Sequence, residues 1–332
     1  MDFKKIVFLF PGQGAQYPGM GLDLLESRTV KILFDAASDI TGKDMGALLR
    51  NTDGETLKRT DISQPAITLV NLSAAAFLAE RGIHPAACAG FSLGEYAALR
   101  IAGLLSLEDC FRLVKYRGEV MQEAADRLRE AAESASGDVS GSAPGMAAVV
   151  GLAPDQVESL IAGWKAGGPG VLADLYPANI NSPRQTVVSG TGAALAEAES
   201  RFKEAGARRF IRLQVAGPFH SPLISGAAEK FRPLLEKTPF GDPLIPLYSN
   251  VTGKRVASGE EAKKLALAQI TGPVRWTDEE KALNEAGDFD AALETGPGKV
   301  LQGLWKDSGS PLPCYPAGSR ADIEGLNIGG RE

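Results

Sequence analysis

The sequence has few of the residues that most often carry redox and metal chemistry. Its 332 residues include only two histidines and three cysteines. Cys88, Cys110 and Cys314 are odd in number, widely spaced and without the spacing of metal ligands. This pattern predicts free thiols in a reducing compartment and no metal site. Any mechanism that needs a histidine must use His84 or His220.

Long apolar runs and an excess of positive charge are also missing. Near the N-terminus, Lys4 and Lys5 precede only five apolar residues before Pro11, which is too short for the core of a signal peptide. The formal net charge of -6 disfavours a general affinity for nucleic acid or anionic membranes. We therefore expect a cytoplasmic protein with no membrane span and no nucleic-acid partner.

The residues that are present predict an α/β fold. Hydrophobic residues make up 44% of the chain, enough for a packed core, and the length indicates two domains or one large domain with an insertion. The segment 64–82 is apolar on all sides, as in a helix buried against a sheet, and Ser106 begins another helix with Asp109 as its capping partner. The expected strands are residues 5–10, 86–91, 245–250 and 289–295.

The composition changes at residues 133–145, where serine and glycine predict a flexible linker. The residues that follow have a βαββαβ pattern, typical of a ferredoxin-like domain, and strand patterns resume after it. We therefore predict a discontinuous large α/β domain at 1–143 and 213–316, with a small domain inserted at 144–212. The remaining C-terminal tail, 317–332, has a polar, glycine-rich composition that favours disorder.

The pattern Gly90-Phe91-Ser92-Leu93-Gly94 lies between an expected strand and an expected helix. Gly-x-Ser-x-Gly in this context is typical of a nucleophile elbow, in which small residues on both sides of the serine allow a tight turn. The helix that follows would direct a backbone amide toward a developing oxyanion. The alternative is a serine that caps the helix, with two incidental glycines.

A serine nucleophile needs a base, and only one histidine can reach it. His84 begins the strand that ends at the elbow, about 16 to 20 Å from Ser92 at about 3.3 Å per residue. His220, in a loop that enters a helix, is therefore the expected base, although a lone histidine is often structural. No carboxylate stands out as a third member, so a backbone carbonyl is the candidate to orient the ring.

Two glycine-rich loops do not match phosphate-binding motifs. The loop PGQGAQ at 11–16 is followed by Tyr17 where a dinucleotide-binding motif needs glycine. The loop GPGK at 296–299 lacks both the upstream glycine and the serine or threonine of a P-loop. We interpret the first loop as the source of a second oxyanion donor, the Gln13 amide, with a structural turn as the alternative.

Together these motifs resemble one family, the malonyl-CoA:acyl-carrier-protein transacylases with the related acyltransferase domains of polyketide synthases. Each motif is weak alone, but nine in the family's order, from position 8 to about 304, are specific. The matching segments are FLFPGQGAQYPGMG, DISQPAI, GFSLGEYAAL, YRGEVMQEAA, ANINSPRQTVVSG, VAGPFHSPL, YSNVTG, ITGPVRW and ETGPGKVLQGL.

The resemblance implies an α/β hydrolase-like large domain with a parallel sheet and a nucleophile elbow, and an inserted ferredoxin-like α+β small domain. It implies a Ser92–His220 dyad, with the histidine oriented by the main-chain carbonyl of Gln269. It also implies that the backbone amides of Gln13 and Leu93 form the oxyanion hole.

The resemblance also implies substrate contacts. Arg117 would bind the free carboxylate of the malonyl group, because a guanidinium offers a planar pair of donors that a carboxylate fits. The residues alone do not distinguish Arg117 from a solvated surface arginine. Gln64 would be the family's substrate-side glutamine, and Asn179 and Asn181 would contact the CoA or pantetheine arm, although turn asparagines look the same.

The implied reaction is ping-pong transfer of malonyl from malonyl-CoA to the phosphopantetheine thiol of acyl carrier protein, through a malonyl-serine ester, for fatty-acid synthesis. No cofactor is implied, and we expect a monomer. Leu93 and Phe219 resemble the malonyl-selective pattern, in which bulky side chains disfavour an α-methyl group. One methyl is worth only about 1 to 3 kcal/mol, so this expectation is weaker than the carboxylate requirement.

The chain departs from the family at two places. Phe91 stands where the family usually has histidine, and the linker around 126–144 is longer than expected. Either departure could alter the rate or the acyl selectivity.

Three other functions fit parts of the pattern. A trans-acting polyketide-type acyltransferase would use the same chemistry. A thioesterase or hydrolase is disfavoured by Arg117 and by the nine ordered motifs, and a degenerate carrier-protein binding module is disfavoured because Ser92, His220 and Arg117 occur together. A basic docking surface would involve residues of the small domain, with Lys203, Arg208 and Arg209 as candidates.

Overall fold

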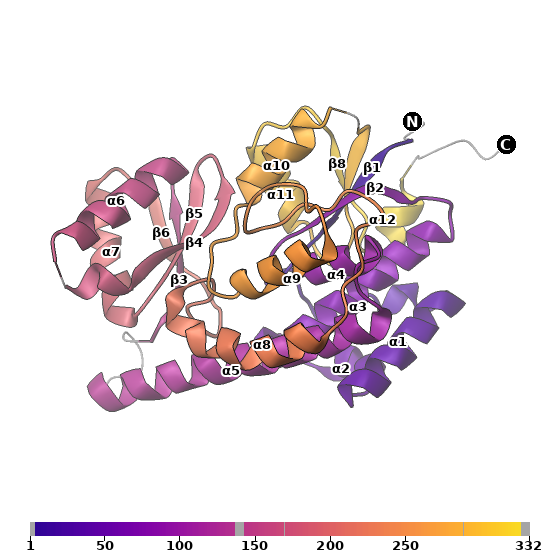
Figure 1. The fold of residues 1–332 in the computed structure, drawn as a ribbon, viewed down its shortest axis with the longest axis horizontal. Helices are drawn as coiled ribbons and strands as arrows, with labels where there is room; N and C mark the ends of the chain where they lie inside the picture. The colour runs from indigo at the N-terminus through magenta and orange to yellow at the C-terminus, as the bar shows by residue number, and fades with distance from the viewer. Residues whose placement is uncertain (1–3, 137–142, 169, 288, 327–332) are drawn as a thin grey trace.

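The computed structural model describes residues 4–136, 143–168, 170–287 and 289–326. Figure 1 shows two sheets side by side, each with its own helices, and the long helix α5 (Leu107–Ser136) running below both in this view.

The first sheet is parallel, as predicted, and its strand order brings two functional loops together. All five residues of β1 are buried, which explains its continuous apolar sequence. β1 and β2 pair in register up to their last residues, Phe10 beside Gly90, so the loops that follow both strands leave the sheet at the same point. The order is β2 (Pro85–Gly90), β1 (Ile6–Phe10), β7 (Ala291–Glu294) and β8 (Cys314–Pro316).

Helix α3 (Thr60–Ala79) is the central helix of the main apolar core. It packs against α5, α1 (Arg28–Thr41) and α4 (Gly94–Ile101), and it shares one core cluster with the β1 side chains that face it. It is long and apolar enough to cross a membrane, but 83% of its most apolar window is buried inside the protein. Its apolar character is therefore that of a core helix, as the sequence predicted.

The second sheet confirms the predicted ferredoxin-like topology. All of its strand pairs are antiparallel, and the βαββαβ order places the first and third strands in the centre. Helices α6 (Pro154–Ala166) and α7 (Gly192–Glu204) pack on it and enclose a second core. The predicted domain boundaries stay a prediction. The strand order is β4 (Leu175–Ser182), β5 (Gln185–Gly190), β3 (Gly145–Val150) and β6 (Arg209–Arg212).

The remaining helices connect these layers. Of these, α10 and α11 lie against β4 and so join the two sheets. The α-helices are α2 (Met45–Asn51), α8 (Ser225–Lys237), α9 (Gly259–Ala268), α10 (Trp276–Glu285), α11 (Val300–Asp307) and α12 (Arg320–Glu324). The short 3-10 helices are η1 (Leu22–Leu24), η2 (Thr56–Lys58), η3 (Val171–Asp174) and η4 (Pro222–Ile224).

Three local predictions need correction. Residues 245–250 make only isolated bridges, at Leu247 with Cys88 and at Tyr248 with Arg255, because the chain turns at once after them. The predicted linker at 133–145 begins with the last turn of α5, since alanine and glutamate favour helix there, and residues 137–142 lie outside the described part.

The predicted C-terminal tail is also partly ordered. Ser319 caps α12, and Ile323 on that helix is 2% exposed, so one apolar side chain holds the segment on the core. Residues 327–332 lie outside the described part. The predicted cap at Ser106 is present, because its hydroxyl accepts the Asp109 amide at 3.0 Å.

Candidate active site

Ser92 lies on the tight turn that the Gly-x-Ser-x-Gly pattern predicts. The turn joins β2 to α4, and Ser92 has a φ of 51°, a left-handed conformation that non-glycine residues rarely adopt. A Cβ at Gly90 would lie 2.2 Å from the carbonyl carbon of Gly94, and a Cβ at Gly94 would lie 1.9 Å from the Phe10 carbonyl oxygen. Only glycine therefore fits on either side, which is the geometry of an elbow rather than of a capping serine.

His220 is the only histidine near this serine. Its Nε2 lies 2.7 Å from Ser92 Oγ, and its Nδ1 lies 2.8 Å from the carbonyl oxygen of Gln269. A carbonyl can only accept, so Nδ1 carries the proton and Nε2 is left to accept the serine hydroxyl. His84 is exposed at the far end of β2, as expected.

The electrostatics of the site keep His220 neutral. Burial lowers its pKa to about 4, with a further contribution from the nearby positive charge of Arg117. A neutral imidazole at physiological pH can take a proton at once, so His220 has the protonation state that a general base needs.

Two residues that line the same cavity have free backbone amides. Gln13 and Leu93 both line it, and neither backbone amide has an acceptor within the described part of the chain. The loop of Gln13 is held close to the elbow, since a Cβ at Gly12 would lie 2.3 Å from the Phe91 carbonyl oxygen, and Asn71 donates to the Pro11 carbonyl at 3.0 Å. Free amides in fixed positions are suited to binding an oxyanion.

Arg117 on α5 is buried at 1% exposure and reaches the same cavity. Its Nη2 donates to the Gln269 side chain at 3.1 Å, its guanidinium lies 5.5 Å from the Tyr96 ring, and its Nε has no partner among the described residues. Burial lowers its pKa, and the nearby Tyr96 and Glu95 oppose that shift. No ion pair of the described residues involves Arg117, so its charge can meet an incoming anion.

The cavity has a volume of about 180 Å³ and lies between the two sheets. It contains most of the predicted site residues, together with apolar side chains that the sequence did not indicate, including Met121, Val300 and Leu304. The predicted residues that line it are Gln13, Ser92, Leu93, Arg117, Asn179, Asn181, Phe219 and His220.

Two predicted residues do not line the cavity, although the Gln269 carbonyl contacts His220 as the resemblance implies. Gln64 is buried but does not line the cavity; its Nε2 lies 3.5 Å from Sδ of Met121, which does, so Gln64 lies one layer behind the wall. Gln269 also lies behind the wall; its carbonyl oxygen accepts from His220, and its side chain accepts from Arg117.

Asn181 donates to Gln185 at 2.8 Å, while its Oδ1 has no partner among the described residues.

Phe91 forms part of the cavity wall and belongs to the adjoining apolar core. Its ring lies 5.5 Å from that of Trp276 in an edge-to-face arrangement, and it packs on the core cluster that contains Val7 and Leu9. Phe91, which stands where the family usually has histidine, therefore packs its apolar ring among apolar side chains.

Sequence reasoning missed a buried polar cluster below the elbow. Asn250, Glu95 and Glu279 are 0 to 4% exposed and are joined to one another and to the Ser92 amide by hydrogen bonds. Asn250 belongs to the expected strand 245–250 and to the family motif YSNVTG, and neither pattern indicates a role for its side chain. A lone asparagine at a turn gives no local signal that its side chain reaches another loop.

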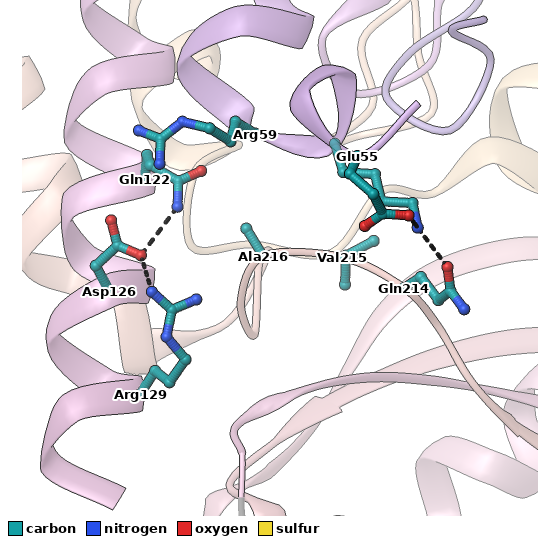
Figure 2. Close-up of a pocket in the computed structure, with 9 residues that line it drawn as sticks. Glu55, Arg59, Gln122, Asp126, Arg129, Gln214, Val215 and Ala216 are labelled. Carbon is teal, nitrogen blue, oxygen red and sulfur yellow. Dashed lines mark hydrogen bonds and ion pairs between the residues drawn. The ribbon is translucent and has the colours of Figure 1, made fainter. Parts of the chain in front are cut away.

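A second pocket adjoins the cavity and shares Val215 with it (Figure 2). It is lined by cations and carboxylates that neutralise one another. Nζ of Lys58 is 2.6 Å from Glu55, Nε of Arg59 is 3.1 Å from Asp61, and Nη2 of Arg129 is 2.6 Å from Asp126.

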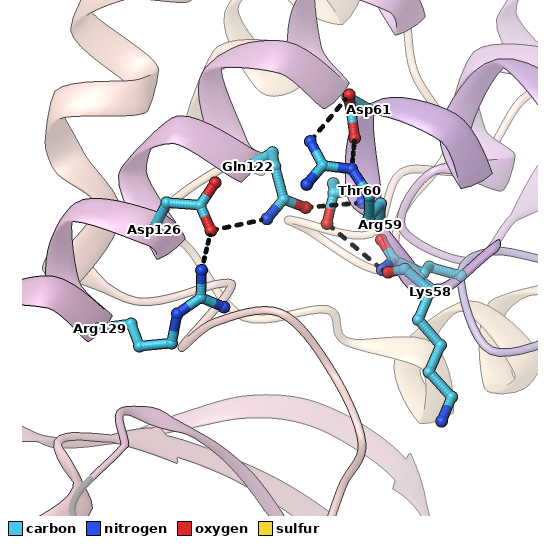
Figure 3. A network of polar contacts seen from close by, with 8 residues as sticks. Lys58, Arg59, Thr60, Asp61, Gln122, Asp126 and Arg129 are labelled. Atoms are coloured by element: carbon cyan, nitrogen blue, oxygen red, sulfur yellow. Dashed lines mark hydrogen bonds and ion pairs between the residues drawn. The ribbon is translucent and has the colours of Figure 1, made fainter. Parts of the chain in front are cut away.

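The wall of this second pocket supports the loop that contains Gln13 (Figure 3). Gln122 accepts the Thr60 amide at 2.8 Å and donates to Asp126 at 3.1 Å. The Gln13 side chain in turn lies 3.4 Å from both the Thr60 hydroxyl and the Lys58 carbonyl. These contacts help to hold the loop that presents the Gln13 amide.

Comparison with known proteins places the chain in a family of acyltransferases. Residues 7–310 match the family model described as acyl transferase domain. The chain is 38% identical over 324 residues to the malonyl CoA-acyl carrier protein transacylase of Bacillus subtilis, covering 97% of this chain and 96% of that one. The crystal structure of an acyl carrier protein S-malonyltransferase from Vibrio cholerae superposes with a TM-score of 0.86 at 32% identity, covering 98% and 100%.

A further solved structure contains a malonyl-transacylase together with a type II polyketide synthase acyl-carrier protein. It matches with a TM-score of 0.85 at 33% identity, covering 97% of this chain and 98% of that one. The chain therefore belongs to the acyltransferase family that includes the malonyl CoA-acyl carrier protein transacylases.

Proposed function

We propose that the protein transfers a malonyl group from malonyl-CoA to the phosphopantetheine thiol of acyl carrier protein, through an ester on Ser92. The observation that carries the proposal is a single buried cavity that contains the Ser92–His220 pair and the Arg117 guanidinium. The names of the relatives support the same substrate and partner.

In the first half-reaction, Ser92 Oγ attacks the thioester carbonyl while His220 Nε2 takes the hydroxyl proton. The amides of Leu93 and Gln13 stabilise the negative charge that develops on the carbonyl oxygen. The C–S bond then breaks, and the CoA sulfur leaves with the proton from His220. The product is malonyl-Ser92, and the histidine is neutral again.

In the second half-reaction, the same groups act in reverse. The phosphopantetheine thiol gives its proton to His220 and attacks the ester carbonyl, and Ser92 leaves as a hydroxyl with that proton. Asn179 and Asn181 line the cavity from β4 and are the proposed contacts for the pantetheine arm. No cofactor takes part in this proposal.

Arg117 accounts for the choice of acyl group. A malonyl carboxylate would accept two hydrogen bonds from the guanidinium and neutralise a charge that is otherwise buried. An acetyl group offers neither, so it leaves the charge uncompensated. Leu93 and Phe219 lie on the same cavity and would disfavour an α-methyl group, an effect of about 1 to 3 kcal/mol.

We place the reaction in fatty-acid synthesis, in the cytoplasm, and propose that the protein acts as a monomer. The second candidate is malonyl supply to a polyketide carrier protein, which uses the same chemistry and is favoured by the match to a transacylase solved with such a partner.

The test is acylation of the protein by malonyl-, methylmalonyl- and acetyl-CoA, each alone, followed by intact-protein and peptide mass spectrometry, with Ser92→Ala as the control. We expect a malonyl adduct on Ser92 only. The absence of any adduct would favour a binding module, and acetyl labelling at the malonyl level would refute the role of Arg117. Rapid CoA release without carrier protein would indicate a hydrolase. Carrier proteins of the two pathways, offered in competition, then separate the two candidates.

A further inference from the structure

Asn250 lies directly below the nucleophile turn, and its side chain bridges the turn's two sides. It is fully buried, and its Oδ1 accepts the backbone N–H of Ser92. Its Nδ2 donates to the Gly90 carbonyl oxygen at 2.6 Å and to Oε1 of Glu279 at 2.6 Å. One amide side chain therefore joins the residue before the elbow to the nucleophile itself.

We propose that Asn250 is a positioning residue that holds the strained elbow in its reactive conformation and keeps the Ser92 amide out of the oxyanion hole. This inference rests on the proposed acyl transfer only in the choice of substrate, because it concerns the reactivity of Ser92 itself.

The elbow needs such support. A serine with a φ of 51° is held in a conformation that is unfavourable for a non-glycine residue, so the surrounding structure must stabilise it. The amide of Ser92, just before α4, would also lack an acceptor if Asn250 were absent. Asn250 satisfies this donor and the Gly90 acceptor with one rigid group.

The same bond decides which amides can bind an oxyanion. The Ser92 amide is already used by Asn250, whereas the Leu93 and Gln13 amides have no acceptor among the described residues. The asparagine thereby leaves two donors for the oxyanion, on one side of the serine.

Asn250 is also linked to the base and to Arg117 through Gln269. The side-chain nitrogen of Gln269, Nε2, lies 3.3 Å from Asn250 Oδ1 and donates to the Ser92 carbonyl oxygen at 3.0 Å. The same residue accepts from Arg117 and, through its carbonyl, from His220. A displaced Asn250 would therefore disturb the nucleophile first and its neighbours through Gln269.

Glu279 supports Asn250 through a buried hydrogen bond. It is fully buried, its Oε1 accepts from Asn250, and its Oε2 has no partner among the described residues. The charged groups that act on it are the acids Glu95, Glu280 and Asp278, so burial and this negative surrounding raise its pKa. A glutamine at 279 would keep the contact, because its amide oxygen can accept the same hydrogen bond.

The experiment compares Asn250→Ala and Asn250→Asp with Glu279→Gln in the full-length protein. Asn250→Asp keeps an acceptor for the Ser92 amide but loses the donor to Gly90. Leu49→Ala, at a buried position of α2 that does not line the cavity, controls for a general loss of stability. Two rates are measured on each protein after its thermal unfolding curve is recorded: malonyl-Ser92 formation against malonyl-CoA concentration, and Ser92 labelling by a fluorophosphonate.

We expect both Asn250 variants to lower the limiting acylation rate and the fluorophosphonate rate on the order of 10²-fold, with little change in the half-saturating concentration of malonyl-CoA. Glu279→Gln and Leu49→Ala should keep both rates. Wild-type rates in folded Asn250 variants would overturn the inference, as would an equal rate loss in Leu49→Ala at the same unfolding temperature. The wild-type protein could fail to form malonyl-Ser92 while the variants still show the expected differences in fluorophosphonate labelling. That result would refute the proposed function and leave the inference about Asn250 supported.

Discussion

The carbonyl oxygen of Gln269 lies 2.8 Å from Nδ1 of His220, in the place where many serine enzymes have a carboxylate. A neutral carbonyl fixes the tautomer and the ring orientation, but it gives little stabilisation to a charged imidazolium. Burial and the positive charge of Arg117 act in the same direction and lower the histidine pKa to about 4. The base is therefore present in its active form over most of the pH range.

This arrangement predicts an unusually acidic limit for activity. Acylation of Ser92 requires neutral His220, so its rate should stay flat from about pH 8 to pH 5 and fall with a midpoint near pH 4. The measurement is the rate of malonyl-Ser92 formation in rapid quench across this range. A midpoint near 6.5, the ordinary histidine value, would contradict the prediction.

Folding stability must be measured at each pH as well, because the lowered pKa of His220 also changes the free energy of unfolding. The folded-state pKa lies below the unfolded value, so the unfolded chain binds the proton first as the pH falls from 6.5 toward 4. This contribution lowers the free energy of unfolding in that window. Circular dichroism at each pH distinguishes loss of the base from unfolding.

Replacing Arg117 should change which acyl group the protein accepts. We expect Arg117→Ala to lower kcat/KM for malonyl-CoA by about 10²-fold, because the charge-assisted bonds to the carboxylate are lost, with no such loss for acetyl-CoA. Arg117→Lys should recover little, since an ammonium lacks the planar pair of donors. Steady-state kinetics with both thioesters test this.

Arg112→Ala is the matched control for that prediction. Arg112 lies on the same helix, but its side chain is 52% exposed and pairs with surface acids. Its replacement should leave both kcat/KM values unchanged. Equal losses for malonyl and acetyl transfer in Arg117→Ala would show that Arg117 supports the fold of the site rather than the choice of substrate.

The elbow and most of the strands could be predicted from local pattern, because a turn and the apolar run of a strand are encoded by neighbours in sequence, whereas the pairing of β1 with β2 and β7 is not. Gly90, Ser92 and Gly94 form one turn, and the strand before it and the helix after it are encoded on either side. His220 followed from counting histidines and from the reach of a strand. In each case few residues of the required type were available, so the sequence allowed few other assignments.

The rest of the site depends on tertiary contacts that local pattern does not contain. Arg117 and Gln269 came only from the family resemblance, because an arginine on a helix has the same sequence pattern whether it is buried or solvated. Asn250 was missed because its partners are 158 and 160 residues away in sequence. The end of α5 was predicted too early because we interpreted its serines as the start of a linker. The alanines and the glutamate beside them favour helix.

The close packing around the elbow predicts that Gly94 cannot be replaced. A Cβ there would overlap the Phe10 carbonyl oxygen, so Gly94→Ala should lower the free energy of unfolding by about 3 kcal/mol or more. Gly163→Ala, in the interior of α6 with no atom within 4 Å of the added Cβ, should raise it by about 0.5 to 1 kcal/mol. Urea unfolding of the three proteins checks both signs, and a Gly94→Ala protein as stable as wild type would contradict the elbow geometry.

Phe91 is the position where the chain departs from its family next to the nucleophile. Its ring faces Trp276 in an apolar cluster, and the hydrogen bond between Ser92 and His220 forms without it. We expect Phe91→His to leave the acylation rate and the preference for malonyl-CoA unchanged, while lowering the free energy of unfolding by about 1 kcal/mol, because a polar ring replaces the edge-to-face contact. Phe91→Leu, which keeps an apolar side chain, is the control and should behave alike in catalysis. Single-turnover kinetics with malonyl- and acetyl-CoA, run beside urea unfolding, separate the two effects. A faster or less selective Phe91→His protein would show instead that this residue tunes the reaction.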